Sequence, residues 1–375
     1  MEPETESEVV DAIAGAGGPL RIVGGGTRPI GRPTQGEPLS MAKLSGVTMY
    51  EPGALTLSAR AGTPVAEIEA TLAAEGQRLA FEPMDHRGLL GTEGEPTIGG
   101  VVAANISGPR RIQAGACRDF LLGVRFVDGT GTAIKNGGRV MKNVTGYDLS
   151  KLMAGSWGTL GAITEVSLKT LPATAATAVL LIEGLSDERA VAALSAALGS
   201  PFEITGAAHL PVGLDGDPVT MIRIEGFETS VAYRAERLRE LLSGFGSADV
   251  ETNPDRTAAG WAWVRDVAAF HGMPGDVWRL SVKPADAPEI AARIGAERLV
   301  YDWGGGLVWA LAAEGADARK RIGKFSGHAT LIRASEETRS RIPAFQPEPD
   351  PVAAISAGLR AKFDPRGILN PGLMN

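Results

Sequence analysis

The chain has 375 residues, of which 44% are hydrophobic and 22% charged, and its formal net charge is −7. This length favours two domains, each with enough apolar residues for a buried core. The acidic balance argues against nucleic acid as a partner. No stretch reaches the roughly 18 apolar residues of a membrane span. The single cysteine, Cys117, excludes an internal disulfide and fits a cytoplasmic protein; peripheral attachment to the inner membrane through a partner is left open.

The first 173 residues predict alternating strands and helices joined by glycine-rich turns. Residues 20–23 are expected to form a strand that runs directly into the triple glycine that follows it. Residues 55–59 predict a second strand, and Thr63 and Pro64 are typical of a helix start. Residues 120–127 and 132–134 predict a hairpin, followed by a strand over 162–170 and a domain end at Pro172.

The middle of the chain, 174–335, has a different pattern. Predicted strands alternate with helices such as 186–198 and 230–242 in the order βαββαβ, which is typical of a ferredoxin-like antiparallel sheet and is compatible with the unit being used twice. Residues 336–375 combine a proline-rich linker, a helix over 352–363 and a tail that we expect to return to the first domain. The fold class is therefore α+β.

Three glycine-rich segments are candidates for binding a ligand through the backbone. The first, RIVGGGTRPIGRP, lacks the Gly-Lys-Ser/Thr end of a P-loop, and Pro29 stands where a dinucleotide-binding motif needs its third glycine. A glycine nest that holds a pyrophosphate fits better, although a triple glycine is also common in simple turns.

The second and third segments have few polar side chains. In TIGGVVAANISG these are Thr97, Asn105 and Ser107, which suit the polar edge of a cofactor or, in the structural alternative, a turn before Gly108. In GSWGTLGAITEVSLK a glycine turn enters a strand that carries Ile163, which is either beside the ligand or an ordinary core residue.

These segments, together with VMKNVTGYDLSKLMAGSWGTLGAITE and the terminal FDPRGILNPG, resemble flavoproteins of the vanillyl-alcohol-oxidase type. Within that family the chain is most similar to the smaller, FAD-binding subunits of bacterial glycolate oxidases. The resemblance covers the first 170 residues and the tail, and it implies a two-part FAD-binding domain of the PCMH type with a ferredoxin-like cap. It also implies bound FAD.

Motif by motif, the resemblance implies FAD contacts in four places. The first loop would hold the pyrophosphate, the second segment would line the ribityl chain and the flavin ring, and the third segment and the tail would complete the site. The implied residues are Gly24, Gly25, Gly26, Thr27, Pro83, Thr97, Gly99, Gly100, Asn105, Ser107, Gly158, Thr159, Gly161, Ile163 and Asn370.

Two histidine positions bear on how FAD is held. Some relatives attach flavin through a histidine directly after the triple glycine; Thr27 stands there, so the resemblance implies noncovalent FAD. His86 lies near the second loop, where an ordinary surface or supporting role is the preferred interpretation over an attachment site.

Side chains for independent catalysis are hard to identify. Related hydroxy-acid enzymes carry histidines in the cap, whereas residues 301–309 here contain none, and no metal site is expected. Arg110, Arg111 and Lys142 are candidates to bind a substrate carboxylate, although solvated surface charges are the preferred reading of both arginines. Five tryptophans gather in the middle of the chain and are interpreted as buried core, whereas several exposed ones would mark an interface; they are Trp261, Trp263, Trp278, Trp303 and Trp309.

The resemblance implies an FAD-dependent oxidoreductase subunit of a glycolate oxidase complex. Its partners would be a larger catalytic flavoprotein subunit and an iron–sulfur subunit, and its substrate a small hydroxy acid oxidised as glycolate is to glyoxylate. Two alternatives stay open: an autonomous FAD-dependent oxidoreductase of another hydroxy acid or alcohol, and a noncatalytic scaffold with a flavin fold.

Overall fold

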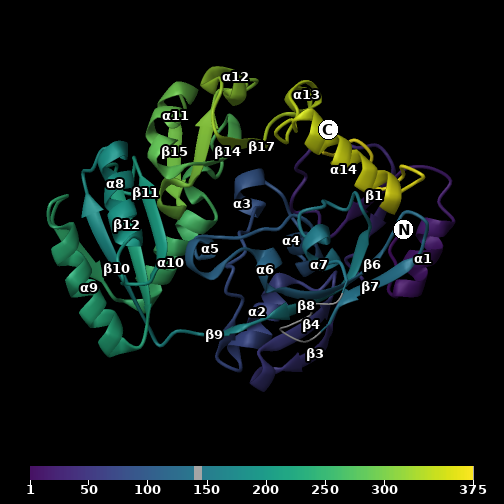
Figure 1. The fold of residues 1–375 in the computed structure, drawn as a ribbon, viewed down its shortest axis with the longest axis horizontal. Helices are drawn as coiled ribbons and strands as arrows, with labels where there is room; N and C mark the ends of the chain where they lie inside the picture. The colour runs from purple at the N-terminus through teal and green to yellow at the C-terminus, as the bar shows by residue number, and fades with distance from the viewer. Residues whose placement is uncertain (139–145, 375) are drawn as a thin grey trace.

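The structure is a computed structural model that describes residues 1–138 and 146–374. Its strands form two large antiparallel sheets, one in each half of the chain, and two small pairs. The first half and the middle of the chain lie side by side, and the C-terminal segment crosses back toward the N-terminus (Figure 1). The predicted α+β class is confirmed.

The first half is built around a five-stranded antiparallel sheet. The predicted hairpin is confirmed, because Val127 pairs with Ala133 across a tight turn. Helix α2 starts one residue later than expected, with Pro64 as its cap. In sheet order the strands are β3 (Val47–Glu51), β4 (Thr56–Arg60), β8 (Ala162–Lys169), β6 (Leu121–Val127) and β7 (Ala133–Gly137).

Short helices cover this sheet and bury one continuous apolar core. Leu57, Val166 and Phe126 from three strands meet Ile68 and Val102 from two helices, and all five are fully buried. Burying side chains of this size removes roughly 1.5–3 kcal/mol of unfavourable hydration each. The helices are η1 (Pro52–Ala54), α2 (Val65–Ala73), α3 (Arg87–Leu90), α4 (Ile98–Ala103), α5 (Arg111–Ala114), α6 (Cys117–Phe120) and α7 (Leu149–Met153).

A small parallel pair beside this sheet connects both ends of the chain. Strand β1 (Leu20–Val23) pairs with β2 (Glu37–Ser40). On the other side of β1, the N–H of Leu20 donates to the carbonyl of Ile368 at 2.7 Å, and the N–H of Asn370 donates to Leu20 at 2.9 Å. The flanking helices are α1 (Glu6–Ala14), α13 (Glu336–Arg341) and α14 (Asp350–Phe363).

The middle of the chain forms one eight-stranded sheet in which the βαββαβ pattern occurs twice. A single pair, His209 with Tyr301, joins the two units. Strand β9 (Leu171–Pro172), paired with β5 (Gln77–Arg78), leads into this sheet. The first unit is β10 (Ala176–Glu183), α8 (Asp187–Leu198), β11 (Ile204–Leu210), β12 (Val219–Gly226), α9 (Glu228–Leu242) and β13 (Ala248–Glu251).

The second unit follows a connecting helix and repeats the same order of elements. The predicted βαββαβ unit therefore occurs twice. Its elements and the connection are α10 (Pro254–Arg265), η2 (Ala268–Phe270), β14 (Asp276–Val282), η3 (Pro284–Asp286), α11 (Ala287–Ile294), β15 (Arg298–Asp302), η4 (Trp303–Gly305), β16 (Leu307–Ala312), α12 (Ala318–Ile322) and β17 (Gly327–Arg333).

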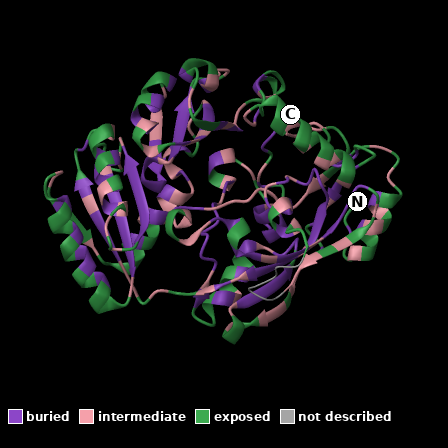
Figure 2. Ribbon diagram, in the orientation of Figure 1, coloured by how far each residue is buried: buried purple, intermediate pink, exposed green. Residues whose placement is uncertain are grey.

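The two faces of this sheet have different neighbours. Helices α8 and α9 cover one face of the first unit, and α11 and α12 cover the same face of the second. On the opposite face, Trp303 and Trp309 share an apolar cluster with Ile30 and Met84 of the first half. The central strands of both sheets are buried, whereas the edge strands β3 and β7 and the outer helices are partly exposed to solvent (Figure 2). The eight-stranded sheet therefore acts as a cap on the first half.

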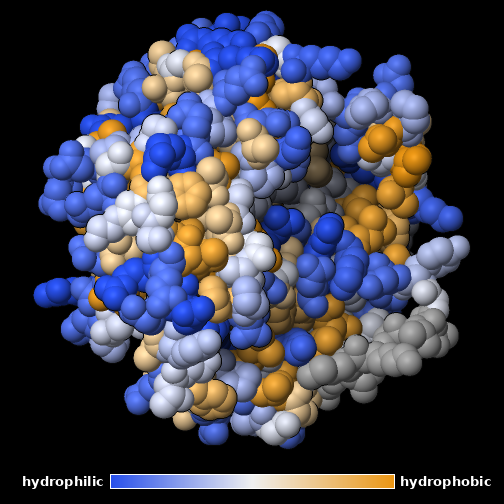
Figure 3. Space-filling model, turned by 60° about the vertical axis from the view of Figure 1, so that its left-hand side comes forward, coloured by the Kyte–Doolittle hydropathy of each residue, from blue (hydrophilic) through white to orange (hydrophobic). Residues whose placement is uncertain are grey.

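The surface mixes polar and apolar residues. On the face seen in Figure 3 they intermingle, and the surface is hollowed toward one side. Among the described helices, none is long and apolar enough to cross a membrane.

Candidate functional site

A cavity of about 360 Å³ lies where β1 and its following loop meet α4, the turn before β8, and the C-terminal tail. This volume is within the usual range for cofactor sites. Most of the residues implied by the family resemblance line it. They are Gly24, Gly25, Gly26, Thr27, Thr97, Gly99, Gly100, Gly158, Gly161, Ile163 and Asn370.

The loop after β1 presents unpaired backbone N–H groups to this cavity. Within the described residues, the N–H groups of positions 24–28 donate to no protein acceptor. Gly26 has φ +72°, a left-handed conformation that turns successive N–H groups toward one side. Such a run of donors is a nest for an anion such as a phosphate.

The glycines of this loop also allow a neighbouring loop to approach. A Cβ on Gly25 would lie 1.6 Å from the carbonyl oxygen of Glu95, and one on Gly94 would lie 2.4 Å from the carbonyl oxygen of Gly25. A Cβ on Gly24 would meet Oγ1 of Thr97 at 2.4 Å. Positions 24 and 25 therefore need glycine because the neighbouring segment at Glu95 and Thr97 packs directly against them, whether or not a ligand is bound.

Arg28 is a cavity residue that the sequence motifs did not identify, although it directly follows the glycine loop. Its Nε donates to Nδ1 of His86 at 3.3 Å, while its Nη2 is buried without a partner among the described residues. Burial lowers the pKa of Arg28 to about 10, a value at which the guanidinium stays charged at neutral pH. It adds a cation to the anion nest.

His86 is buried rather than on the surface, so that part of the expectation is wrong. Burial, and then the charge of Arg28, lower the pKa of His86 to about 3. The ring is therefore neutral at physiological pH and supports Arg28 as a hydrogen-bond acceptor.

The tail closes the opposite wall of the cavity. Asn370 accepts from the N–H of Ile22 at 2.8 Å and donates to the carbonyl of Trp157 at 2.8 Å, so its amide joins β1 to the turn before β8. Gly158 has φ +71°, and a Cβ there would lie 2.8 Å from Nδ2 of Asn370. Trp157 itself lines the cavity and is a second residue that the motifs missed.

Four implied residues, Pro83, Asn105, Ser107 and Thr159, do not line this cavity. Asn105 accepts from the N–H of Arg118 at 3.0 Å and Ser107 from the N–H of Cys117 at 2.9 Å, so both side chains bind the start of α6 instead of capping the turn before Gly108. Thr159 donates to the carbonyl of Ser156 at 2.7 Å. Their contact with a cofactor stays a prediction.

FAD fits the groups that this cavity offers. Its pyrophosphate matches the free N–H groups and Arg28, and its large flat rings match walls of small and apolar residues.

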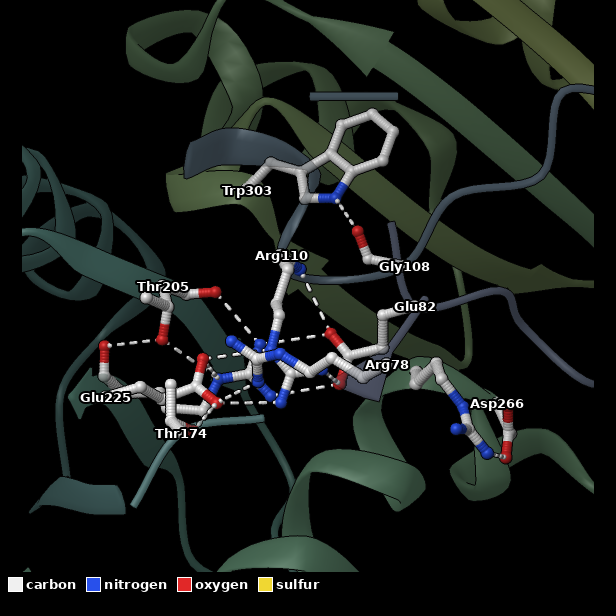
Figure 4. Close-up of polar contacts among 11 residues, drawn as sticks. Arg78, Glu82, Gly108, Arg110, Thr174, Thr205, Glu225, Asp266 and Trp303 are labelled. Carbon is white, nitrogen blue, oxygen red and sulfur yellow. Dashed lines mark hydrogen bonds and ion pairs between the residues drawn. The ribbon is translucent and has the colours of Figure 1, made fainter. Parts of the chain in front are cut away.

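A second feature is a buried ion network between the first half and the cap (Figure 4). Arg223 of β12 donates to both carboxylate oxygens of Glu82, each at 3.0 Å. Arg110 donates to Glu225 at 2.9 and 2.8 Å, and Arg78 reaches Glu225 at 2.7 Å. Arg110 is therefore not the solvated charge that the sequence favoured, and it holds two parts of the molecule together.

The network keeps its carboxylates ionised. Burial acts to raise the pKa of Glu82, but the charges of Arg223 and Arg110 outweigh it and leave the pKa below its usual value. The same balance, with Arg110, Arg223 and Arg78, places the pKa of Glu225 far below its usual range. Glu82 also has φ +51°, a strained conformation for this residue, which the paired charges stabilise.

Asp302, at the end of β15, differs from these acids. It is buried, and its Oδ1 accepts only from the N–H of Trp303, at 2.7 Å, among the described residues. Burial raises the pKa of Asp302 to about 7, and the negative charge of Glu82 adds to the rise. It stands in the segment 301–309, where Trp303 and Trp309 are buried as expected.

No group of three His, Cys, Asp or Glu in residues 1–138 and 146–374 is arranged to hold a metal ion. Lys142, a candidate for carboxylate binding, lies outside the described residues.

Known proteins resemble this chain in sequence along nearly its whole length. An FAD binding domain family matches residues 1–137. The glycolate oxidase subunit GlcE of Escherichia coli strain K12 is 37% identical over 361 residues, which cover 95% of this chain and 92% of the relative. The glycolate oxidase subunit GlcD of Bacillus subtilis is 35% identical over a shorter segment, 35% of this chain and 27% of the relative.

A solved structure of alkyldihydroxyacetonephosphate synthase shares the fold, with a TM-score of 0.72 at 19% identity, over 99% of this chain and 75% of that one. FAD is therefore the cofactor, and the chain is an FAD-binding oxidoreductase with a cap. The chain belongs to the family of the glycolate oxidase subunit GlcE.

Proposed function

We propose that this chain is the FAD-binding subunit of a glycolate oxidase, in which it takes part in the oxidation of glycolate to glyoxylate. The observation that carries this proposal is the 37% identity to GlcE, which spans 95% of the chain and therefore both the cavity and the cap. The partners would be a larger catalytic flavoprotein subunit and an iron–sulfur subunit, since the only cysteine, Cys117, is buried and single.

The cavity described above is the proposed site of noncovalent FAD. The N–H groups of residues 24–28 and the guanidinium of Arg28 would hold the pyrophosphate. Gly100, Ile163 and Trp157 would bound the rest of the cofactor, and Asn370 would fix the wall opposite the loop. When bound, FAD supplies the two-electron redox chemistry.

The chain's own residues perform a supporting role in this proposal. Thr27 cannot form the histidine–flavin bond known from some relatives, and neutral His86 keeps the Arg28 side chain in place. The cap packs Trp303 and Trp309 into one apolar cluster with Ile30, a residue that lines the cavity.

Reconstitution with the two partner subunits tests the function. The complex should oxidise glycolate with an added electron acceptor, and leaving this chain out should abolish the reaction. FAD should be released from this chain intact by heat or acid denaturation. A complex that oxidises glycolate equally well without this chain would contradict the proposal, as would FAD that stays covalently attached after denaturation.

A further inference from the structure

Two guanidinium groups meet on one tryptophan at the boundary between the first half and the cap. Arg111 of α5 lies 4.4 Å from the ring of Trp303, and Arg279 of β14 lies 5.0 Å from the same ring and 5.9 Å from the ring of Trp309. The indole Nε1 of Trp303 donates to the carbonyl of Gly108 at 3.1 Å, which fixes the ring (Figure 4). One arginine therefore comes from each side of the boundary.

In the described part of the chain neither guanidinium is paired directly with a carboxylate, although Asp302 and Asp119 are near enough to favour the charged forms of Arg279 and Arg111. Among the described residues, no side-chain hydrogen bond and no ion pair within 4.0 Å joins Arg111 or Arg279 to an acceptor, in contrast to Arg110 and Arg223 a short distance along the boundary. Aromatic stacking stabilises a guanidinium by about 0.5–2 kcal/mol but leaves its in-plane N–H donors free. Both residues are intermediate in burial, so part of each side chain faces solvent.

The two charges repel each other in partly dry surroundings. Burial, and then the charge of Arg111, lower the pKa of Arg279 to about 10. Burial also lowers the pKa of Arg111. The two groups stay protonated at neutral pH, and a bound anion would relieve both the desolvation and the repulsion.

The pair lies close to the cavity proposed for FAD. Trp303 and Trp309 belong to the same apolar cluster as Ile30 and Trp157, and both of these line the cavity. His86, which accepts from Arg28 of the cavity, has Arg279 among the charges that depress its pKa.

We propose that Arg111 and Arg279 bind the carboxylate of a small 2-hydroxy acid at the boundary between the FAD-binding half and the cap, with Trp303 holding the two guanidinium groups. This assignment rests on the proposed function for its choice of anion. Two planar forks of donors suit the two oxygens of a carboxylate, and one carboxylate satisfies groups from both halves at once. The subunit would then recognise the acid itself instead of only relaying electrons.

Binding to the complete, FAD-loaded chain tests the proposal without turnover. Glycolate is titrated by calorimetry, with ethylene glycol as the uncharged comparator. Arg279→Gln and Arg111→Gln should each weaken glycolate binding about 10- to 100-fold, because each removes charge-assisted hydrogen bonds. Arg279→Lys should restore part of the affinity, since it restores the charge but not the fork.

Arg237→Gln is the matched control. Arg237 lies on α9, on the outer side of the cap, and its half-exposed side chain pairs with Glu240, so its loss should leave the affinity for glycolate unchanged. The FAD content of all variants should equal that of the native chain. If Arg279→Gln fails to fold, Arg111→Gln and Arg279→Lys make the same test.

Unchanged glycolate affinity in both Gln variants would overturn the proposal, and so would equal affinity for ethylene glycol. A native chain that retains FAD but binds no glycolate would also overturn it. The proposed function would still be tested separately by the reconstituted complex, because glycolate could be oxidised in that complex while bound to another subunit.

Discussion

The cavity and the boundary with the cap bind by opposite means. At the cavity the chain offers mainly backbone N–H groups and small residues, with Arg28 directly after the glycine loop and Arg21, Arg32 and Arg339 also in the lining. At the boundary it offers long charged side chains, some paired in the Glu82–Arg223 network and two, Arg111 and Arg279, unpaired. A large cofactor needs close backbone approach along its whole length, whereas a small anion needs a few directed charges, and the two regions meet those needs separately.

The largest effect is expected when a paired charge is removed from the boundary between the first half and the cap. Glu82→Gln would leave Arg223, Arg110 and Arg78 to share the single carboxylate of Glu225, and we expect the free energy of unfolding to fall by about 3–5 kcal/mol. Denaturant unfolding measures this. Glu236→Gln is the control, because Glu236 forms an exposed pair with Arg239 and its loss should cost less than about 1 kcal/mol.

The pH dependence of the native chain has a defined sign. Because the folded pKa of Glu82 lies below its ordinary value of 4.5, the pair contributes stability above that pH and loses it as the pH falls further. Glu82→Gln should flatten this acid limb of the stability profile. Equal acid sensitivity in the variant and the native chain would contradict the role given to Glu82.

A side chain added to the glycine loop should weaken FAD binding at the cavity. Gly25→Val would push the loop away from the carbonyl of Glu95, and we expect about 100-fold weaker FAD binding, because the N–H nest loses its shape. Gly17→Val is the control: Gly17 is exposed, and a Cβ there meets nothing within 4 Å. Equilibrium binding of FAD to the apo chain checks both, and equal affinities would show that the pyrophosphate is held elsewhere.

Asp302 sharpens the contrast between paired and unpaired acids. Its folded pKa of about 7 lies above its ordinary value of 3.8, so ionisation disfavours folding increasingly from pH 3.8 to 7. Asp302→Asn keeps an acceptor for the N–H of Trp303 and removes the charge. We expect a gain of about 1–3 kcal/mol in the free energy of unfolding at pH 8 and little change at pH 4. Equal effects at both pH values would contradict this.

The smallest expected effect concerns Arg28, the arginine that directly follows the glycine loop. Arg28→Met keeps the aliphatic stem, and we expect about tenfold weaker FAD binding from the lost charge–phosphate interaction. Arg60→Met, at the exposed end of β4, should bind FAD normally. An unchanged affinity in the Arg28 variant would place the pyrophosphate away from this side chain.

The sequence was sufficient where a local pattern determines the structure. Alternation and turn residues predicted the β6–β7 hairpin, and the element order predicted a cap of βαββαβ units. The glycine-rich loops predicted close backbone contacts. The structure shows one of them, because a side chain on Gly25 would overlap the carbonyl of Glu95.

Long-range partners could not be predicted in the same way. Arg110 looks like a surface charge until Glu225, 115 positions away, is placed beside it. Arg28 and His86 are likewise 58 positions apart, and nothing local marks either as a partner of the other. Residues whose role depends on a distant neighbour need the folded structure.

Amide hydrogen exchange tests the central claim most directly. In the apo chain the N–H groups of residues 24–28 have no protein acceptor, so they should exchange fast and become strongly protected when FAD is added. Amides in α9, which lies on the outer side of the cap, should exchange at the same rate with and without FAD. Stoichiometric FAD binding with no protection of residues 24–28 would contradict the account.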